Sequence, residues 1–241
     1  MAGTCVVGLQ WGDEAKGKIV DLLTESHDIV VRYQGGANAG HTVVTGGQTY
    51  KLSLMPSGIL RPNVQCVITG GVVLTPASLL DEIDQLLARG VTVASNLMIS
   101  DRAHVIFPWH NEEERLRNLG ASDVDAIGTT MRGIGPCYRD KVGRSNAVRL
   151  GDMYRPGFKK QVERIVASKN PTLASLAGDN FVPLDAEAIF RHYSGFAERL
   201  KPFVTDTTEF LLSSLEAGKR LLFEGAQGSL LDVDHGTFPF V

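Results

Sequence analysis

The chain has 241 residues, enough for a sizeable core, and its 43% hydrophobic and 21% charged residues are typical of a globular protein. Disordered, fibrous and coiled-coil chains are excluded. The 24 basic and 27 acidic residues give a net charge of −3, which argues against a broad nucleic-acid-binding surface. The longest apolar runs are far below the roughly 18 residues that a membrane span needs, so we expect no membrane segment.

The cysteines point to a reducing compartment. Cys5, Cys66 and Cys137 are widely spaced and form no C-x-x-C pair, which predicts neither a disulfide framework nor a zinc site. No basic residue precedes the first apolar run, so we expect no secretory signal, and the cytoplasm fits best. Cys5 and Cys66 are interpreted as small core residues inside strands, while Cys137 has no assigned role.

In chain order, apolar runs of strand length alternate with segments of 3.6-residue periodicity. This pattern predicts an α/β protein with a largely parallel central sheet. Strands are expected at 4–9, 29–33, 64–69, 97–100, 105–107 and 221–223, and helices at 16–24, 75–90, 112–119, 158–168, 185–200 and 206–217. Gly46-Gly47 separates the segments 42–45 and 48–54 and predicts a β-hairpin, because glycine supplies the positive φ of primed turns.

The domain organisation is expected to be simple. Residues 1–241 are interpreted as a single, incomplete α/β domain, in which 151–203 form a helical excursion from the sheet. The chain stops on the apolar segment Phe238–Val241, whereas natural ends are usually more polar. We therefore expect the sequence to be part of a longer protein.

The loop Gly12–Lys18 follows the first expected strand and opens a helix. It matches the first part of the phosphate-loop pattern G-x-x-x-x-G-K, in which backbone N–H groups and a lysine face an anion. Ile19 stands where the pattern has a hydroxyl for magnesium, and Asp13 is the obvious substitute, because magnesium prefers carboxylate and phosphate oxygens. The alternative is an ordinary glycine turn with solvated charges.

A second glycine-rich cluster, Gln34–Thr42, has three glycines before His41. Small residues allow close backbone approach, and a histidine can donate a proton near neutral pH. We interpret His41 as functional, although a histidine at the start of a strand is more often structural.

Two further clusters contain polar groups in glycine-rich surroundings. The segment Ile127–Pro136, with Asp140, Lys141 and Arg144 after it, has two hydroxyls and several cations that suit a phosphate monoester. A polar surface loop is the alternative. Phe223–Gly228 follows a strand, where open α/β sheets bind ligands, and Gln227 could read an amide-like base edge. Asp232, Asp234 and His235 resemble a metal cluster only loosely, and structural roles are favoured for them.

Taken together, five segments resemble adenylosuccinate synthetases. They are Gln10–Lys18, Tyr33–Thr42, Pro56–Leu60, Gly128–Thr130 with Gly135-Pro136, and Glu224–Gly228, in the family's order along the whole chain. The resemblance implies a P-loop-related fold and the GTP-dependent ligation of L-aspartate to IMP, through 6-phosphoryl-IMP, which is the first committed step towards AMP. It also implies a cytoplasmic homodimer that requires Mg²⁺.

The resemblance further implies roles for individual residues. Asp13 resembles the catalytic base at N1 of IMP and a Mg²⁺ ligand, His41 the catalytic acid at the transferred phosphate, and the Gly40 carbonyl a second Mg²⁺ ligand. The implied GTP contacts are Gly12, Asp13, Glu14, Ala15, Lys16, Gly17, Lys18, Gly40, His41 and Thr42. The implied IMP contacts are Asp13, Glu14, Ala15, Lys16, Asn38, Ala39, Gly40, His41, Thr130, Gln227 and, acting in trans from the other subunit of the dimer, Arg144.

Two departures from the family pattern matter. Ala15 stands where most members have glycine, so a positive φ at this position would be strained. Members of the family are also longer, and their second half resembles the part that reads guanine and holds aspartate, so we expect this chain alone to be inactive. The alternative functions are a P-loop phosphotransferase acting on another small acceptor, and a non-catalytic nucleotide-binding or dimerisation module.

Overall fold

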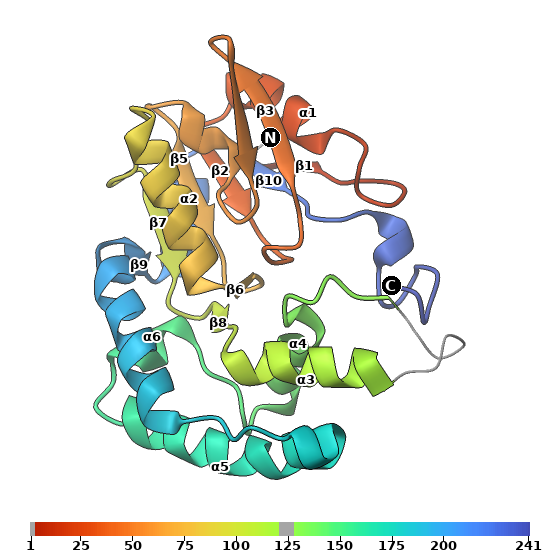
Figure 1. Ribbon diagram of the computed structural model, residues 1–241. Coiled ribbons are helices and arrows are strands. Elements are labelled where there is room, and N and C mark those ends of the chain that lie inside the picture. Colours follow the sequence, from red (N-terminus) through yellow and green to blue (C-terminus); the bar gives the residue numbers. More distant parts are fainter. Residues whose placement is uncertain (1–2, 121–127) are drawn as a thin grey trace.

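The computed structural model of the protein describes residues 3–120 and 128–241. Its centre is a six-stranded sheet in the order β1-β10-β2-β5-β7-β9, and all neighbouring strands in it are parallel (Figure 1). The strands are β1 (Gly3–Val6), β10 (Leu221–Glu224), β2 (Ile29–Arg32), β5 (Gln65–Ile68), β7 (Leu97–Ser100) and β9 (Val204–Thr205). The expected α/β class with a largely parallel sheet is confirmed.

Two smaller sheets stand beside the central one. The expected hairpin is present as β3 (His41–Thr45) and β4 (Gln48–Leu52), with Gly46 and Gly47 at φ 57° and 74° in its turn. The second pair is parallel and joins β6 (Val73–Leu74) to β8 (His104–Val105). His41 is the first residue of β3, so the hairpin positions its buried imidazole.

Helices cover both faces of the sheet. They are α1 (Lys16–Thr24), α2 (Pro76–Ala88), α3 (Pro108–Gly120), α4 (Ile134–Gly143), α5 (Phe158–Ala177), α6 (Ala186–Leu200) and α7 (Thr207–Glu216). Val30 and Ile68 point into the main core with α1, α2, α5 and α6, whereas Val31 and Val67 form a second apolar cluster with α7. Since both faces are covered, these strands are continuous apolar runs rather than alternating ones.

The described residues between β8 and β9 form α3, α4, α5 and α6, and α3, α4 and α5 lie below the central sheet in Figure 1. Phe107, which precedes α3, stacks on Trp109 of α3 and on Tyr193 of α6, with ring centroids 4.3 and 4.1 Å away. The chain then returns through β9 to pair with β7. In the described part of the chain, no helix is long and apolar enough to cross a membrane.

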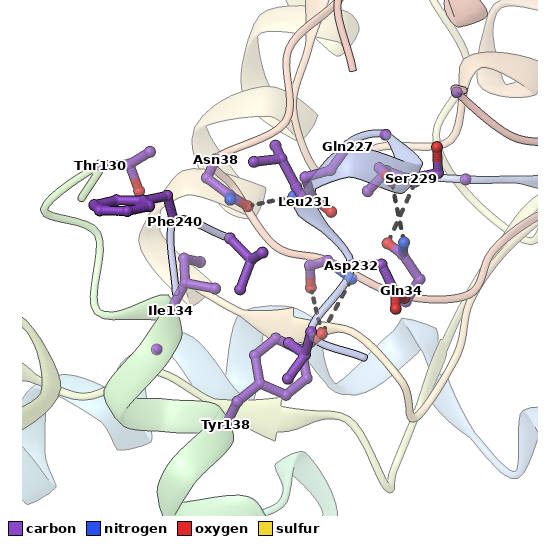
Figure 2. A pocket seen from close by; sticks show the side chains of 18 of the residues that line it. Gln34, Asn38, Thr130, Ile134, Tyr138, Gln227, Ser229, Leu231, Asp232 and Phe240 are labelled. Atoms are coloured by element: carbon purple, nitrogen blue, oxygen red, sulfur yellow. Dashed lines mark hydrogen bonds between the residues drawn. The ribbon is translucent and has the colours of Figure 1, made fainter. Parts of the chain in front are cut away.

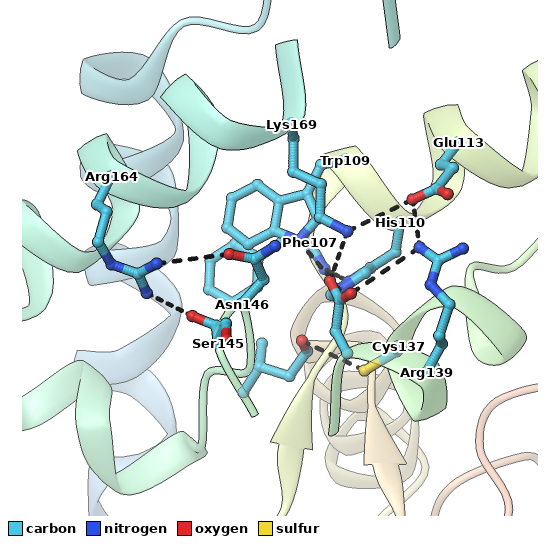
Figure 3. A network of polar contacts seen from close by, with 12 residues as sticks. Phe107, Trp109, His110, Glu113, Cys137, Arg139, Ser145, Asn146, Arg164 and Lys169 are labelled. Carbon is cyan, nitrogen blue, oxygen red and sulfur yellow. Dashed lines mark hydrogen bonds and ion pairs between the residues drawn. The ribbon is translucent and has the colours of Figure 1, made fainter. Parts of the chain in front are cut away.

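A buried charged network joins α3, α4 and α5 (Figure 3). The Lys169 Nζ atom lies 2.7 Å from Asp140 and 3.4 Å from Glu113, and Arg139 Nη2 lies 2.5 Å from Glu113. Burial alone would raise the pKa of Glu113, but hydrogen bonds from two arginines outweigh it and lower this pKa to about 2. The network fixes α4, and so the residues that α4 presents towards the sheet.

The first strand differs from expectation. β1 ends at Val6 rather than at position 9, and Val7 and Leu9 are 53% and 74% exposed. Cys5, expected in the core, is exposed, whereas Cys66 is buried as expected. The physical reason is position: β1 lies at the edge of the six-stranded sheet, so its side chains are covered less than those of inner strands.

The helical part also departs from the expected boundaries. The helix expected at 112–119 begins at Pro108, and the one expected to end at 168 continues through Pro171 to Ala177. The polar segment after Gly133 forms α4, which buries Cys137, and burial raises the pKa of its thiol to about 12. Tertiary packing thus extends elements whose ends are ambiguous in the sequence.

Candidate nucleotide site

A cavity of about 1250 Å³ opens at the carboxyl ends of β1, β2 and β10 (Figure 2). Ligands commonly bind at this edge of open parallel sheets, because the loops after neighbouring strands converge there. The lining residues come from the segments 7–9, 33–35, 128–130 and 225–229, with Asn38, Glu114, Ile134, Gly135, Tyr138, Leu231, Asp232, Val233, His235, Phe240 and Val241. The cavity therefore brings together the second, third and fourth glycine-rich clusters.

Asn38 and Gln227, two of the expected IMP contacts, meet directly at this cavity. The Gln227 side-chain amide donates a hydrogen bond to Asn38 Oδ1 at 3.0 Å (Figure 2). Beside them, the Gln34 amide donates to the Ala226 carbonyl at 3.0 Å and accepts from the Ala226 N–H at 3.3 Å. Gly35 has φ 85° and no room for a Cβ atom against Ala226, so glycine is required for this close approach.

Tyr138 of α4 links the third cluster to the second. Its hydroxyl donates to the Gly71 carbonyl at 2.8 Å and accepts from the Gly35 N–H at 3.1 Å. Thr130, the third expected IMP contact in the cavity, lies in the loop that leads into α4. Arg132 in the same loop donates to the Ala37 carbonyl. Ile127, the first residue of this cluster, lies outside the described residues.

The loop between β1 and α1 is held by its own charged residues. The Glu14 carboxylate accepts hydrogen bonds from the N–H groups of Gln10 and Gly12 at 2.7 and 3.1 Å. The hydrogen bond from Gly12 is the largest of the effects that lower the pKa of Glu14, and together they outweigh burial, which alone would raise this pKa. Lys16 is buried, and its ammonium donates to the Gly12 carbonyl at 2.7 Å. Asp13, at the same loop, is exposed.

His41 is buried between two charged side chains, Arg32 and Glu224, which are the last residues of β2 and β10. Its Nε2 atom lies 2.7 Å from Arg32 Nη1, and its Nδ1 atom lies 2.5 Å from Glu224 Oε1. Glu224 is fully buried and accepts hydrogen bonds from the Ser57 N–H and hydroxyl at 3.0 and 2.8 Å. Gly17 permits this packing, because a Cβ atom there would lie 3.2 Å from His41 Cβ.

The contacts of His41 determine where its proton lies. Arginine only donates hydrogen bonds, so the Nε2 atom that faces Arg32 must be the acceptor. A second bare acceptor 2.5 Å from the Glu224 carboxylate would be repelled, so the proton lies on Nδ1. The Nδ1–H group has no hydrogen bond of good geometry. Its contact with the Glu224 carboxylate is therefore a close electrostatic approach rather than an aligned hydrogen bond. Burial alone would raise the pKa of Glu224, but His41 and Arg32 outweigh it and lower this pKa, which keeps the carboxylate ionised.

Several expected site residues do not line the cavity. Asp13, Gly40 and Thr42 are exposed outside it, and His41 and Lys16 are buried outside it. Arg144 is exposed at the end of α4 and also lies outside the lining. Within 3–120 and 128–241, no group of three His, Cys, Asp or Glu side chains could hold a metal ion. Asp232 instead accepts hydrogen bonds from the N–H groups of Asp234 and His235, which is a structural turn.

Backbone strain is concentrated in the segments singled out from the sequence. Among the described residues, four non-glycine residues have positive φ: Ala15 at 60°, Met131 at 57°, Arg144 at 66° and Gln227 at 53°. Such conformations cost free energy and persist where the surrounding structure imposes them, often at functional sites. Ala15 is one of them: it adopts the left-handed conformation, which is unfavourable for alanine but not for the glycine that most family members have at this position.

The sequence analysis gave no role to Glu114, which lines the cavity, or to Arg32 and Glu224, which contact His41. Arg32 and Glu224 end the apolar strands β2 and β10 and stand opposite each other in the sheet register. Opposite charges at the same end of two neighbouring buried strands are the signal that could have identified them. Glu114 lies on a charged helix, where nothing in the sequence distinguishes it from its neighbours.

Comparisons with known proteins agree with one another. A family model described as adenylosuccinate synthetase matches residues 5–241. The adenylosuccinate synthetases of Caldanaerobacter subterraneus and Heliobacterium modesticaldum are 52% and 50% identical over the whole chain, which spans 56% of their length. Among solved structures, fully ligated adenylosuccinate synthetase from Plasmodium falciparum has a TM-score of 0.83 and 35% identity, over 100% of this chain and 55% of that one. Succinoaminodeoxyadenylate synthetase of cyanophage S-2L, bound to dGMP and dATP, has a TM-score of 0.63 and 25% identity, over 99% and 55%.

Proposed function

Because the chain belongs to the adenylosuccinate synthetase family, we propose that it supplies the nucleotide-binding part of an enzyme that joins L-aspartate to IMP with GTP. The chain spans about 56% of the length of its curated relatives, so the complete reaction also needs what their remaining length contributes.

The observation that carries the proposal is the meeting of Asn38, Thr130 and Gln227 at one cavity. Amide and hydroxyl groups of this kind can hold a purine edge and a phosphate monoester. A cavity of about 1250 Å³ is large enough for a nucleotide. We propose that IMP binds here, with its phosphate towards the loop that contains Thr130.

In the proposed reaction, Asp13 accepts the N1 proton of IMP, and the 6-oxygen attacks the γ-phosphate of GTP to give 6-phosphoryl-IMP and GDP. The amine of aspartate then attacks C6, loses a proton and displaces phosphate. The chain's contribution is positioning and charge neutralisation, as in phosphoryl transfer generally. For His41 to act as the acid at the transferred phosphate, its imidazole has to leave Arg32 and turn a protonated nitrogen outward.

We propose that Asp13 and the Gly40 carbonyl would hold Mg²⁺. Asp13 is an exposed carboxylate, and Gly40 has open space where a Cβ atom would lie. Mg²⁺ is commonly held by one or two carboxylates together with substrate phosphates, so these two oxygen donors suit an ion that arrives with GTP. Bound Mg²⁺ would neutralise charge on the phosphates, while Asp13 and Gly40 would hold it.

We further propose that the protein acts in the cytoplasm as a homodimer. Arg144 is exposed and lies outside the cavity of its own chain, which suits a residue that reaches the IMP phosphate of a second copy. A guanidinium matches the geometry of a phosphate group.

Calorimetric titration with IMP tests the proposed acceptor. Asn38→Ala is expected to weaken IMP binding about fivefold, the effect of losing one hydrogen bond of about 1 kcal/mol. Asn180→Ala, at an exposed turn after α5, is the matched control and should leave binding unchanged. Equal IMP affinity in the unaltered chain, Asn38→Ala and Asn180→Ala would contradict the proposal that IMP binds in this cavity. The same titration with dGMP, another purine monophosphate, tests whether binding is selective for IMP.

Turnover distinguishes the alternatives. In a full-length version of the protein that forms adenylosuccinate, Asp13→Ala should abolish turnover. The fold should be preserved, because an exposed carboxylate contributes little to packing. Transfer of phosphate to another acceptor without aspartate would favour a phosphotransferase. GTP and IMP affinities unchanged by both Asp13→Ala and His41→Ala would favour a non-catalytic binding module.

A further inference from the structure

The loop that carries Thr129 and Thr130 is held by a carboxylate from outside it. Glu114, on α3, accepts a hydrogen bond from the Thr129 hydroxyl with one oxygen. Its other oxygen accepts from the Gly133 N–H at 2.5 Å. Glu114 is half-buried and lines the cavity together with the two threonines. It therefore ties α3 to the loop proposed to face a phosphate.

The donors that Glu114 occupies are those that a phosphate would need. A hydroxyl and an N–H group at the start of a helix are common partners of phosphate oxygens, and Gly133 immediately precedes α4. Carboxylate and phosphate oxygens accept from the same groups, and both are negatively charged. A phosphate at Thr129 and Thr130 would therefore compete with Glu114 for hydrogen bonds and be repelled by its charge.

The loop between β1 and α1 repeats this arrangement independently. There Glu14 accepts from the backbone N–H groups of Gln10 and Gly12, and Gly12 begins the loop that the sequence predicts to face a phosphate. In both proposed anion sites, a carboxylate of the chain takes donors of the kind that a phosphate would take. The two loops differ in that Lys16 lies 3.5 Å from Glu14, whereas the two hydrogen bonds to Glu114 come from uncharged groups.

We propose that Glu114 is a built-in competitor for the phosphate of the acceptor nucleotide: it orders the 128–133 loop in the free chain and releases Thr129 and Gly133 when the phosphate binds. The inference rests on the proposed function, because it takes the acceptor's phosphate to lie at this loop. Displacing Glu114 consumes part of the binding free energy, so affinity is lower than the loop alone would give. A nucleoside without a phosphate does not displace Glu114.

The test compares Glu114→Gln with the unaltered chain by calorimetric titration. The glutamine side chain retains an acceptor for Thr129 but removes the negative charge. We expect IMP to bind about tenfold more tightly to Glu114→Gln at low salt, and less so at high salt, where charge repulsion is screened. Inosine should bind equally to both proteins. The control is Glu112→Gln on the same helix, whose carboxylate pairs with Arg115 at 2.6 Å and does not line the cavity.

A second measurement needs no variant. In the unaltered chain, IMP or inorganic phosphate should shift the amide resonance of Gly133, because this N–H loses its carboxylate partner. Glu114→Gln that binds IMP no more tightly, or that changes inosine affinity by the same factor, would overturn the proposal. So would a Gly133 resonance that stays fixed at saturation.

The outcomes separate this inference from the proposed function. If IMP does not bind but dGMP or inorganic phosphate binds more tightly to Glu114→Gln, the acceptor assignment fails and the role of Glu114 stands. If IMP binds to the cavity with equal affinity in both proteins, the proposed function stands and the role of Glu114 fails. If no phosphate-bearing probe binds either protein, both fail.

Discussion

Arg32 Nη1, at the end of β2, and His41 Nε2, at the start of β3, lie 2.7 Å apart in a buried region. The pair is completed by Glu224, whose carboxylate lies 2.5 Å from the other imidazole nitrogen. The hydrogen bond at Nε2 and the close approach of Glu224 to Nδ1 give His41 a defined orientation. In this arrangement the Nε2 atom of His41, the residue proposed as the acid, carries no proton, because it accepts a hydrogen bond from Arg32.

The tautomer of His41 is directly measurable. Nitrogen NMR of the imidazole is expected to show a neutral ring protonated at Nδ1, because Arg32 can only donate to Nε2. The His41→Asn variant identifies the signal. A ring protonated at Nε2 would contradict the arrangement, whereas release of the Arg32 contact on addition of GTP and IMP should alter the nitrogen shifts.

Glu224→Gln is expected to destabilise the fold. Glu224 is fully buried with Arg32, so removing its charge leaves an uncompensated buried guanidinium, at a cost on the order of 3 kcal/mol. Ser57→Ala is the matched comparison. It removes one 2.8 Å hydrogen bond to the same carboxylate and should cost about 1 kcal/mol. Urea unfolding measures both, and equal losses would show that the charge of Glu224 contributes nothing special.

Ala15→Gly is expected to stabilise the chain by about 1 kcal/mol. Ala15 has φ 60°, which costs an L-residue free energy that glycine avoids. The control is Ala167→Gly, an exposed position inside α5, where glycine should cost about 1 kcal/mol. Thermal or urea unfolding should therefore give opposite signs for the same chemical change, and the same sign would contradict the strain at Ala15.

The stability is expected to fall with acid through His104. Burial, with the positive charges of Lys141 and Arg149, lowers the pKa of His104 to about 4. An unfolded histidine titrates near pH 6.5, so between about pH 6.5 and 4 the unfolded chain binds a proton that the folded chain does not. The free energy of unfolding therefore decreases as the pH drops through this window, by on the order of 3 kcal/mol.

His104→Gln removes this contribution and should flatten the pH dependence of urea unfolding between about pH 6.5 and 4. His192→Gln, at an exposed position of α6, is the control and should retain the full slope. An unchanged slope in His104→Gln would assign the acid sensitivity to other groups.

The inner strands of the sheet were predictable because they are apolar on both faces, and β2, β5, β7 and β10 lie within one or two residues of their expected bounds. β1 has the same apolar composition but lies at the edge, and an edge position depends on strand order, which no local pattern shows. The strand β9 was missed because it has only two residues, which is too short for a periodic pattern to be recognised. α4 was missed because Pro136 and its glycines suggest a loop, whereas the buried network around Asp140 stabilises a helix.

For the site, the sequence identified the loops better than their interactions. Asn38, Thr130 and Gln227 meet at one cavity, while the roles proposed for Asp13 and His41 stay predictions. Glycine-rich segments after strands are visible locally, because they reflect backbone requirements. The partners of His41 come from two other strands, and only the sheet order and register bring Arg32 and Glu224 to it.

The position of β1 also affects how the protein behaves in solution. Within the described residues, β1 pairs with β10 on one side, so its other side presents backbone N–H and C=O groups to which an extended peptide can add as a new strand. Self-association of the chain by strand addition is therefore expected in concentrated solutions, and an extended peptide that pairs with β1 should reduce it.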